Sequence, residues 1–358
     1  MSTLFIFLWM ILPFCTESLV FPRQDESPLI AVLGFDRFMN IFDPSDGPNA
    51  TVLERINLMG GDWGGASCSI DFNYRDNVIY WSDYYESKVY SLKVNGGDYE
   101  QRVILEDGLD FPEGLAYDWI HNNLYISDFR RHEILVVNPD TGDKRTLITG
   151  VPDIRDVEVD PRTGWLYWIS GWEDTAVLMK STLDGQNQVV ISSDLAMPKT
   201  LSLDYDEQRL YWTEMSPLNI IKSIGVDGEG LTTVYQTVSG RLSTPPKYLT
   251  ISREYLYWNQ GHETIRRADK HQVTEITRYR NVEERDARGK PTNMFMGILA
   301  IDPRKQMESE NFCGNNNGGC SHFCLPTLIQ STPPYNCACP DGMNLMDDNY
   351  SCFDERQM

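Results

Sequence analysis

Positive charge is scarce in this chain of 358 residues, in which 31 lysines and arginines face 52 aspartates and glutamates, giving a formal net charge of −21. Nucleic-acid binding needs a basic surface, so we expect no nucleic-acid partner. The acidic field suits a basic protein ligand, because opposite charge speeds the encounter of two proteins. The alternative is that the charge only keeps a secreted protein soluble.

Long apolar runs are missing after the N-terminus. The run at the start, residues 4–15, is too short to span a bilayer comfortably. Small residues follow it at positions suited to cleavage after Ser18, and it therefore predicts a signal peptide over residues 1–18, although no basic residue precedes it. A retained membrane anchor is the alternative. We expect a secreted, extracellular mature chain without a membrane span.

Cysteine is almost absent before residue 313, where only Cys15 and Cys68 occur. The other six are crowded near the C-terminus, which is typical of a small secreted module held together by disulfides. The sequence alone leaves their pairing open. Cys68 falls in a predicted inner strand, where we expect a buried and unreactive thiol. Two sequons for N-glycosylation, beginning at Asn49 and Asn349, suit the same secretory route.

The most informative feature present is a repeat with steps of 42 to 46 residues. An aromatic strand motif occurs five times: Tyr80-Trp81-Ser82-Asp83, Tyr125-Ile126-Ser127-Asp128, Tyr167-Trp168-Ile169-Ser170, Tyr211-Trp212-Thr213-Glu214 and Tyr257-Trp258-Asn259-Gln260. A short apolar strand and a tight turn precede it, and two further strands follow around a glycine-containing turn. Four strands at this period are typical of a β-propeller blade.

The repeat also predicts what its recurring side chains do. We expect the paired aromatic rings to fill the space between blades and to be buried. An aspartate recurs once per unit at the end of the first strand, as Asp71, Asp118, Asp160 and Asp204. Such regular placement favours a structural anchor, because a catalytic site would break the symmetry of the repeat.

The two ends of the repeat region are expected to complete one more blade. Residues 29–42 resemble a blade that lacks its inner strand, whereas residues 295–302 resemble an inner strand without a blade. Three N-terminal strands and one C-terminal strand would form a sixth blade and close the ring. Closure removes exposed sheet edges.

These motifs resemble the YWTD, or class B, propellers of the low-density lipoprotein receptor family. The segment Gly114-Leu115-Ala116-Tyr117-Asp118 is close to one of that family's repeats, and the tail from Cys313 to Cys339-Pro340 is similar to the EGF-like module that follows such propellers. The resemblance covers residues 28–353. It implies an all-β fold with a six-bladed YWTD β-propeller over residues 28–305 and a small disulfide-rich EGF-like domain over residues 313–353.

The same resemblance implies details that the spacing does not. The disulfides would be Cys313–Cys324, Cys320–Cys337 and Cys339–Cys352, and folding would depend on a chaperone of the endoplasmic reticulum. Residues 308–312 do not fit the paired acidic residues of the calcium-binding version of the module. We therefore expect no metal there.

The expected function is protein binding outside the cell, with lipoprotein-receptor-type or Wnt-pathway signalling as the roles implied by the family. Loops before the inner strands and after the aromatic strands mix aromatic residues with both signs of charge, as protein interfaces do. We expect the ligand-binding face to contain Trp63, Tyr85, Glu113, Phe129, Arg130, Arg155, Trp172, Glu173, Lys199 and His262. Trp172 and Arg155 match the Wnt co-receptor branch, whereas Lys199 stands where that branch usually carries Asn.

Catalytic motifs are lacking, since the chain has no Gly-x-Ser-x-Gly elbow, His-Glu-x-x-His helix or P-loop. We expect no enzyme, no catalytic residue, no metal and no cofactor, although six-bladed propellers include calcium-dependent hydrolases. The sequence is also compatible with an extracellular small-molecule carrier or a matrix linker. A further hypothesis is that histidines near the binding face become protonated at low pH and release the ligand.

Overall fold

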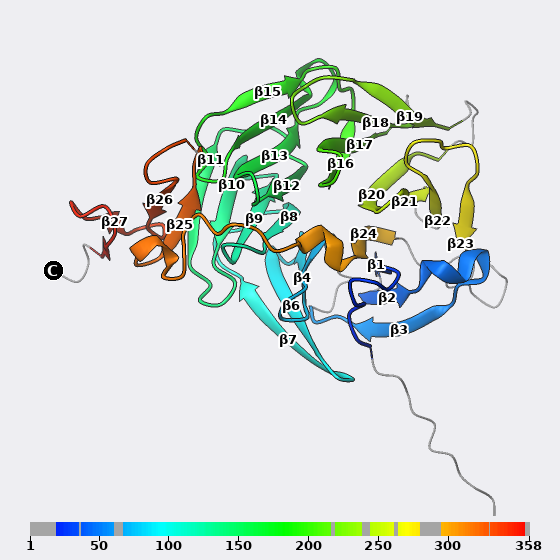
Figure 1. The fold of residues 1–358 in the computed structure, drawn as a ribbon, viewed down its shortest axis with the longest axis horizontal. Coiled ribbons are helices and arrows are strands. Elements are labelled where there is room, and N and C mark those ends of the chain that lie inside the picture. Colours follow the sequence, from blue (N-terminus) through cyan, green and yellow to red (C-terminus); the bar gives the residue numbers. More distant parts are fainter. Residues whose placement is uncertain are drawn as a thin grey trace, which may run out of the picture.

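A computed structural model describes residues 19–35, 37–60, 67–215, 219–237, 244–260, 264–279, 295–328 and 330–354. Within these ranges the fold is almost entirely β, and six four-stranded antiparallel sheets surround a central axis (Figure 1). The expected signal peptide, residues 1–18, lies outside them, as does the side chain of Cys68. In the part of the chain described, no helix has the length and apolar character needed to cross a membrane.

Five blades are built from consecutive strands, numbered here outward from the axis. Blade 1 contains β4 (Ser67–Asn73), β5 (Val78–Asp83), β6 (Lys88–Asn95) and β7 (Asp98–Leu105). Blade 2 contains β8 (Pro112–Asp118), β9 (Asn123–Asp128), β10 (Glu133–Val137) and β11 (Lys144–Thr149), and blade 3 contains β12 (Asp156–Asp160), β13 (Trp165–Ser170), β14 (Val177–Thr182) and β15 (Val189–Ser192). Blade 4 contains β16 (Pro198–Asp204), β17 (Arg209–Glu214), β18 (Ile220–Gly225) and β19 (Thr232–Gln236), and blade 5 contains β20 (Pro246–Ser252), β21 (Tyr255–Gln260), β22 (Thr264–Asp269) and β23 (Thr277–Tyr279).

The sixth blade joins the two ends of the propeller, as predicted. Its inner strand is β24 (Phe295–Ile301), and its outer strands are β1 (Leu29–Gly34), β2 (Phe38–Phe42) and β3 (Val52–Asn57). Ala31 of β1 lies opposite Leu299 of β24 in an antiparallel pair. The strand β24 also packs against β4 and β20, the inner strands of blades 1 and 5, so the ring is closed.

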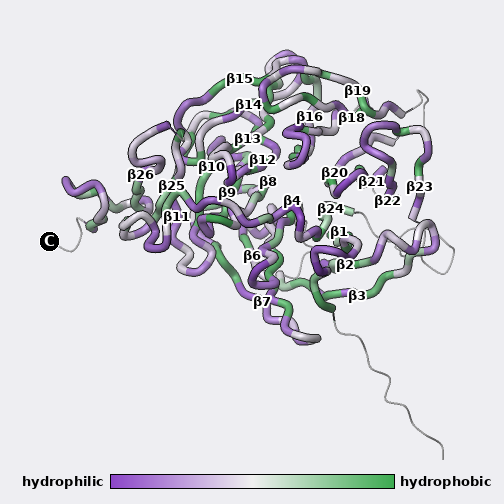
Figure 2. The backbone as a smooth tube through the Cα atoms, in the orientation of Figure 1, coloured by the Kyte–Doolittle hydropathy of each residue, from purple (hydrophilic) through white to green (hydrophobic). Residues whose placement is uncertain are grey.

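Inner and middle strands are apolar because neighbouring blades cover both of their faces. Every residue of β9 and β10 is buried, whereas β7 at the rim has only exposed and partly buried residues before its last two positions. Figure 2 shows the hydrophobic stretches along the strands and hydrophilic residues in many of the connecting loops. This arrangement is the usual one for stacked sheets that form a common core.

The repeated aromatic pair is buried, as predicted. Trp81, Trp168, Trp212 and Trp258 are at most 1% exposed, and the tyrosines of all five motifs are at most 3% exposed. Trp81 stacks on Tyr90 of the next strand with their centroids 5.2 Å apart. These rings are therefore part of the core between blades and present no surface to a ligand.

The recurring aspartates are hydrogen-bonding anchors, as expected, and they fall into two classes. Asp118, Asp160 and Asp204 end their inner strands and accept backbone N–H bonds from the turn that follows, at 2.9–3.2 Å. Asp71 lies two residues before the equivalent position, which Asn73 occupies, accepting from the Asp76 N–H at 3.1 Å. Asp71 instead accepts the N–H of Tyr117 in the neighbouring blade at 2.7 Å.

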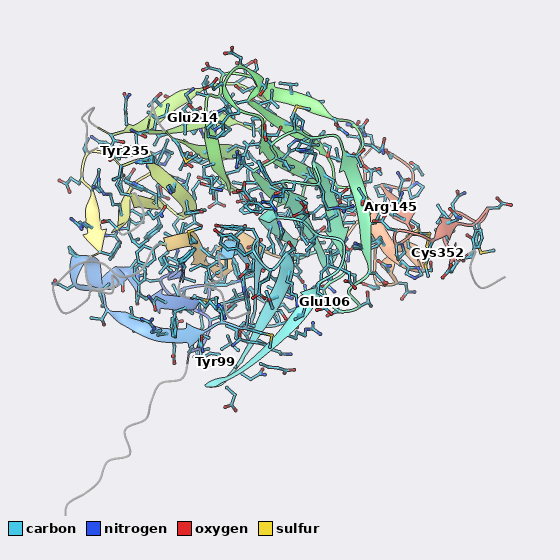
Figure 3. The ribbon with its side chains drawn as sticks, turned by 180° about the vertical axis from the view of Figure 1, so that it is seen from behind. Tyr99, Glu106, Arg145, Glu214, Tyr235 and Cys352 are labelled. Atoms are coloured by element: carbon cyan, nitrogen blue, oxygen red, sulfur yellow. A yellow bond between two sulfur atoms is a disulfide. The ribbon has the colours of Figure 1, made fainter. Side chains whose placement is uncertain are left out.

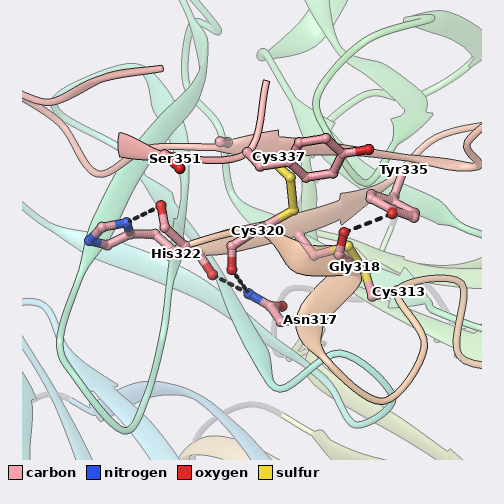
Figure 4. Close-up of a disulfide and its surroundings, with 12 residues drawn as sticks. Cys313, Asn317, Gly318, Cys320, His322, Tyr335, Cys337 and Ser351 are labelled. Carbon is pink, nitrogen blue, oxygen red and sulfur yellow. Dashed lines mark hydrogen bonds between the residues drawn. A yellow bond between two sulfur atoms is a disulfide. The ribbon is translucent and has the colours of Figure 1, made fainter. Parts of the chain in front are cut away.

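The C-terminal module contains β25 (Phe323–Pro326), β26 (Tyr335–Ala338), β27 (Asn344–Leu345) and β28 (Cys352–Phe353). Short 3₁₀ helices occur at Pro44–Asn49 (η1), Glu173–Thr175 (η2), Pro303–Gln306 (η3) and Asn317–Gly319 (η4). The disulfides are Cys313–Cys324, Cys320–Cys337 and Cys339–Cys352, the same pairs that the resemblance implies. Around them Asn317 Nδ2 donates to the carbonyls of Cys320 and His322, and the Tyr335 hydroxyl donates to Gly318 O (Figure 4).

The module packs against blades 2 and 3, where Figure 1 shows β25 and β26 beside β11. Phe323 and Leu325 join the hydrophobic core between blades 2 and 3. Arg145 Nη1 donates to Cys339 O at 2.9 Å, and Figure 3 shows Arg145 next to the module. Asp341 accepts from the backbone N–H of Thr146 at 3.1 Å. Apolar burial and polar contacts together fix the module against the propeller.

Candidate ligand-binding face

One face of the propeller collects the loops that precede the inner strands and those that follow the second strands. Because the inner and second strands are antiparallel, the start of one and the end of the other lie at the same edge of the blade. We call this edge the top face. The EGF-like module contacts the other ends of these strands, near Asn123, Arg145 and Asp184. The top face therefore lies away from the module.

A row of aromatic rings runs across blades 1 and 2 of the top face. The Tyr85 ring lies 4.4 Å from Tyr84, Tyr84 lies 4.3 Å from Phe111, and Phe111 lies 5.7 Å from Phe129. Phe111 has a φ of 83°, so the backbone leaves the extended region there and directs the chain into β8. Tyr85 is 60% exposed and the other three rings are half-buried, which leaves aromatic surface open to solvent.

Arg155 continues this row into blade 3. Its guanidinium lies over the Phe129 ring at 4.4 Å and over the Trp172 ring at 5.3 Å. Arg130 lies over Phe111 at 4.9 Å on the outer side. Such cation–π contacts hold the planar groups against the rings and set the spacing between them. The resulting top-face cluster consists of Tyr84, Tyr85, Phe111, Phe129, Arg130, Arg155 and Trp172.

Charged side chains lie next to this cluster, at the mouth of the central channel. Glu113 accepts from Lys199 Nζ at 3.0 Å and from Arg155 Nη1 at 3.3 Å. The three side chains are 6–16% exposed, so the charges are only partly screened by water. Lys199 Nζ also lies 5.7 Å from the Tyr248 ring of blade 5.

The structure brings together seven of the ten residues expected at this face. Glu113, Phe129, Arg155, Trp172 and Lys199 are linked directly, Tyr85 through Tyr84, and Arg130 through Phe111. Glu173 is exposed beside Trp172, and its backbone N–H donates to Ala196 O at 2.6 Å. Trp63 and His262 lie outside the described residues.

Sequence reasoning did not select four residues that the geometry adds: Tyr84, Phe111, Lys247 and Tyr248. Tyr84 and Phe111 are close in sequence to the selected Tyr85 and Glu113, and Lys247 and Tyr248 lie near the start of β20, so their position was visible in the sequence. Their mutual contacts were not, because they join residues of different blades. The pairing of Tyr84 with Phe111, for example, connects the end of one blade to the start of the next.

Beneath the top face the central channel narrows to a cavity of about 50 Å³. Burial raises the pKa of Asp71 to about 6 and that of Asp156 to about 7, and it raises the pKa of Glu158 well above its ordinary value. Both oxygens of Asp156 accept backbone N–H bonds, from Val157 at 3.0 Å and Leu201 at 2.9 Å. These carboxyl groups tie neighbouring inner strands together.

The channel also limits what can be carried there. Pockets for drug-sized ligands occupy about 300–1,000 Å³, and a single liquid water about 30 Å³. A cavity of about 50 Å³ is well below the size of such a ligand pocket.

The two sequons lie away from the top-face cluster. Asn49 ends η1 at the rim of blade 6, and Asn349 lies between β27 and β28 of the EGF-like module. Both side chains are exposed. Glycosylation at Asn49 and Asn349 remains a prediction that this exposure permits.

Three comparisons relate the chain to known proteins. The family model described as "Coagulation Factor Xa inhibitory site" matches residues 313–352. The vitellogenin receptor Yl of Drosophila melanogaster is 30% identical over 292 residues, which are 81% of this chain and 14% of the relative. A chain in the crystal structure of the nidogen/laminin complex matches with a TM-score of 0.63 and 18% identity, covering 77% of this chain and 98% of that chain.

The three comparisons support different parts of the assignment, namely the fold, the sequence similarity to a receptor and the C-terminal module. The nidogen/laminin match, at 18% identity, shows the propeller fold alone. The receptor match carries sequence similarity over most of the chain, although the chain spans only about one seventh of that receptor's length. The match at residues 313–352 coincides with the three disulfides. With the ring closed as the repeat predicted, the chain is a YWTD β-propeller followed by an EGF-like module of the low-density lipoprotein receptor family.

Proposed function

We propose that this chain is an extracellular protein-binding module that captures a loop of a secreted or cell-surface protein on its top face. The observation that supports this most directly is the top-face cluster, in which exposed and half-buried aromatic rings are held in place by Arg130 and Arg155. Aromatic residues and arginine are the side chains that contribute most to protein interfaces. The core aromatics of the repeat take no part, because they are buried.

The hydrogen bonds made by the channel carboxyl groups favour a binding function over catalysis. Asp71 and Asp156 each accept two backbone N–H bonds, which occupies the oxygens that a catalytic acid or base would need. Their role is to connect adjacent blades. Among the described residues of the top face, the groups brought together are aromatic rings and ion pairs, which suit recognition.

The test uses the purified propeller–EGF chain and a phage-displayed library of disulfide-constrained peptides. Peptides selected on the unsubstituted protein should bind the double variant Phe129→Ala/Trp172→Ala at least about 30-fold more weakly, because interface aromatics of this kind each contribute about 2 kcal/mol. Tyr255→Ala is the matched control, since Tyr255 is a 38% exposed aromatic residue at the opposite end of blade 5. Selected peptides that bind all three proteins equally would contradict the proposal.

Two finer expectations belong to the same proposal. We propose that an endoplasmic-reticulum chaperone assists folding, because β24 must find β1 across almost the whole propeller sequence before the ring closes. We also propose secretion of the chain, in keeping with the disulfides of the module. A lipoprotein-receptor-type or Wnt-pathway role would then depend on which loop the top face selects.

A further inference from the structure

A groove of about 520 Å³ lies where the EGF-like module meets blades 2 and 3. Pockets for drug-sized ligands occupy about 300–1,000 Å³, so the groove has the size of a site for a bound organic group. Because it adjoins the module, it lies away from the top-face cluster. The residues that line it include, from the propeller, Arg145, Asp184 and Gln186 and, from the module, Tyr335, Asn349 and Tyr350.

The position of Asn349 indicates what occupies this groove. Asn349 is the acceptor residue of the sequon Asn349-Tyr350-Ser351, its side chain is exposed, and it is itself one of the residues that line the groove. A glycan joined to its amide nitrogen therefore begins at the groove. The covalent link keeps the first sugars at a high local concentration there, so that weak contacts are enough to hold them.

Two aromatic rings of the groove pack against glycine residues of the module. A Cβ atom at Gly318 would lie 2.6 Å from the Tyr335 ring, whose hydroxyl donates to Gly318 O at 2.8 Å (Figure 4). A Cβ atom at Gly319 would lie 3.5 Å from the Tyr350 ring, which is 42% exposed. Flat aromatic surface that is fixed in this way can pack against the C–H groups on one face of a sugar ring.

The groove also contains polar groups that are held in place. Asn336 Nδ2 donates to Asp184 Oδ2 at 2.9 Å, and the backbone N–H of Gln186 donates to Asp184 Oδ1 at 3.1 Å. The first of these bonds joins the module to blade 3, so a group bound in the groove touches both parts of the molecule. Sugar hydroxyl and acetamido groups are donors and acceptors, so amide and carboxylate groups beside aromatic rings suit a carbohydrate better than an apolar ligand.

We propose that the first N-acetylglucosamine residues of an N-glycan on Asn349 occupy this groove, with one sugar face on Tyr350, and that the glycan thereby helps to fix the EGF-like module to blade 3. This inference rests on the secretion proposed above, because such glycans are added on the secretory route. In the transfer step, Asn349 Nδ2 forms a bond to the anomeric carbon of the first sugar. The bond from that carbon to the oxygen of a lipid-linked diphosphate donor breaks, and the amide loses one proton as the diphosphate leaves.

The test uses the full chain purified from the medium of cultured eukaryotic cells, with mass spectrometry of the glycopeptides at both sequons. Peptide N-glycosidase should release the Asn349 glycan from the native protein at least about tenfold more slowly than the Asn49 glycan, because the sugars must leave the groove before the enzyme reaches them. After reduction and denaturation, the two glycans should be released at similar rates. The Asn49 glycan is the comparison because Asn49 lies at the rim of blade 6.

Substitutions of Tyr350 test the contact itself. Tyr350→Ala should speed release of the Asn349 glycan from the native protein several-fold, and Tyr350→Phe should keep the slow rate because it keeps the ring. Removing the glycan should lower the melting temperature of the unsubstituted protein and of Tyr350→Phe by about 2–4 °C, but should leave that of Tyr350→Ala unchanged. Comparing each variant with and without its glycan cancels the direct effect of the substitution on folding. Tyr255→Ala, which changes a 38% exposed ring in blade 5, is the matched control and should behave as the unsubstituted protein does.

The proposal is overturned if Asn349 of the secreted chain carries no glycan, or if release from the native protein is as fast at Asn349 as at Asn49 and Tyr350→Ala does not change it. Both results leave the proposed binding function standing, because that function is tested by peptide binding to Phe129→Ala/Trp172→Ala. A chain that never reaches the medium would overturn the proposed secretion, and this inference with it.

Discussion

Single carboxyl groups join neighbouring blades at the axis of the propeller. Asp71 of β4 accepts the N–H of Tyr117 in β8, and Asp156 of β12 accepts the N–H of Leu201 in β16. Both are enclosed in the channel, so their ionised forms lose solvation that the two N–H bonds only partly replace. These residues therefore connect adjacent blades, and the free energy needed to keep them ionised in the channel makes the stability of the ring depend on pH.

The raised pKa values predict how stability changes with pH. In the unfolded chain both carboxyl groups ionise near their ordinary value of 3.8, whereas in the folded chain they hold their protons up to about pH 6 and pH 7. A folded-state pKa above the unfolded one stabilises fully below the unfolded value, and that contribution is lost as pH rises through the folded value. Thermal unfolding should therefore occur at lower temperature as pH rises from 5 to 8.

The matched variant for this prediction is Asp156→Asn. Because an amide cannot ionise, the variant should show a shallower fall in melting temperature between pH 5 and pH 8. Its NH₂ group must face one of the two N–H donors, so the melting temperature itself should drop by on the order of 5 °C. An unchanged pH slope measured by differential scanning calorimetry would show that Asp156 does not titrate in this range.

At the level of residues, the sequence predicts roles best where a side chain acts within its own repeat. The buried Tyr-Trp pairs and the turn aspartates Asp118, Asp160 and Asp204 are of this kind. Asp71 is a hydrogen-bonding anchor as well, but its repeat does not indicate its partner, because Tyr117 belongs to another blade. Contacts between blades depend on the twist and spacing of the ring, which a single repeat does not contain.

At the level of elements, the decisive contact is the pairing of β1 with β24. Four residues of β1 from Ile30 to Leu33 are fully buried, and they lie opposite β24 from the other end of the propeller. Without this pairing, β24 would present an open edge of backbone N–H and C=O groups. This pairing was predictable from the sequence because the N-terminal end of the repeat region lacks an inner strand and the C-terminal end has one extra inner strand.

This pairing predicts a large difference between two aspartate substitutions in blade 6. Val32→Asp places a charge in β1 where the side chain is fully buried, and should prevent ring closure and secretion. Leu53→Asp places the same charge in β3 at the rim, where the side chain is 53% exposed, and should leave secretion nearly unchanged. Immunoblots of culture medium and cell lysate measure both. Secretion of Val32→Asp at the unsubstituted level would contradict closure through β1.

At the scale of the whole molecule, the EGF-like module and the candidate binding face have separate places. The module is fixed to blades 2 and 3 through Leu325, Phe323 and Asp341, at the ends of the strands opposite the top face. The sequence predicted both parts but not their relative position, because residues such as Arg145 and Asp341 carry no motif that marks them as partners. Because of this separation the module does not cover the top-face cluster, and it supports the propeller from the other side.

The last prediction follows from that support. Leu325→Ala removes a side chain that is 1% exposed in the core shared with blade 3, and should lower the free energy of unfolding by about 3 kcal/mol, the usual cost of such a truncation. Leu345→Ala in the same module removes a 39% exposed side chain and should change it by less than about 0.5 kcal/mol. Denaturant unfolding measures both, and peptides bound at the top face should keep their affinity for the folded Leu325→Ala protein. If the two variants have equal free energies of unfolding, the module is only tethered to the propeller. If Leu325→Ala loses peptide binding, the two faces are coupled through blade 3.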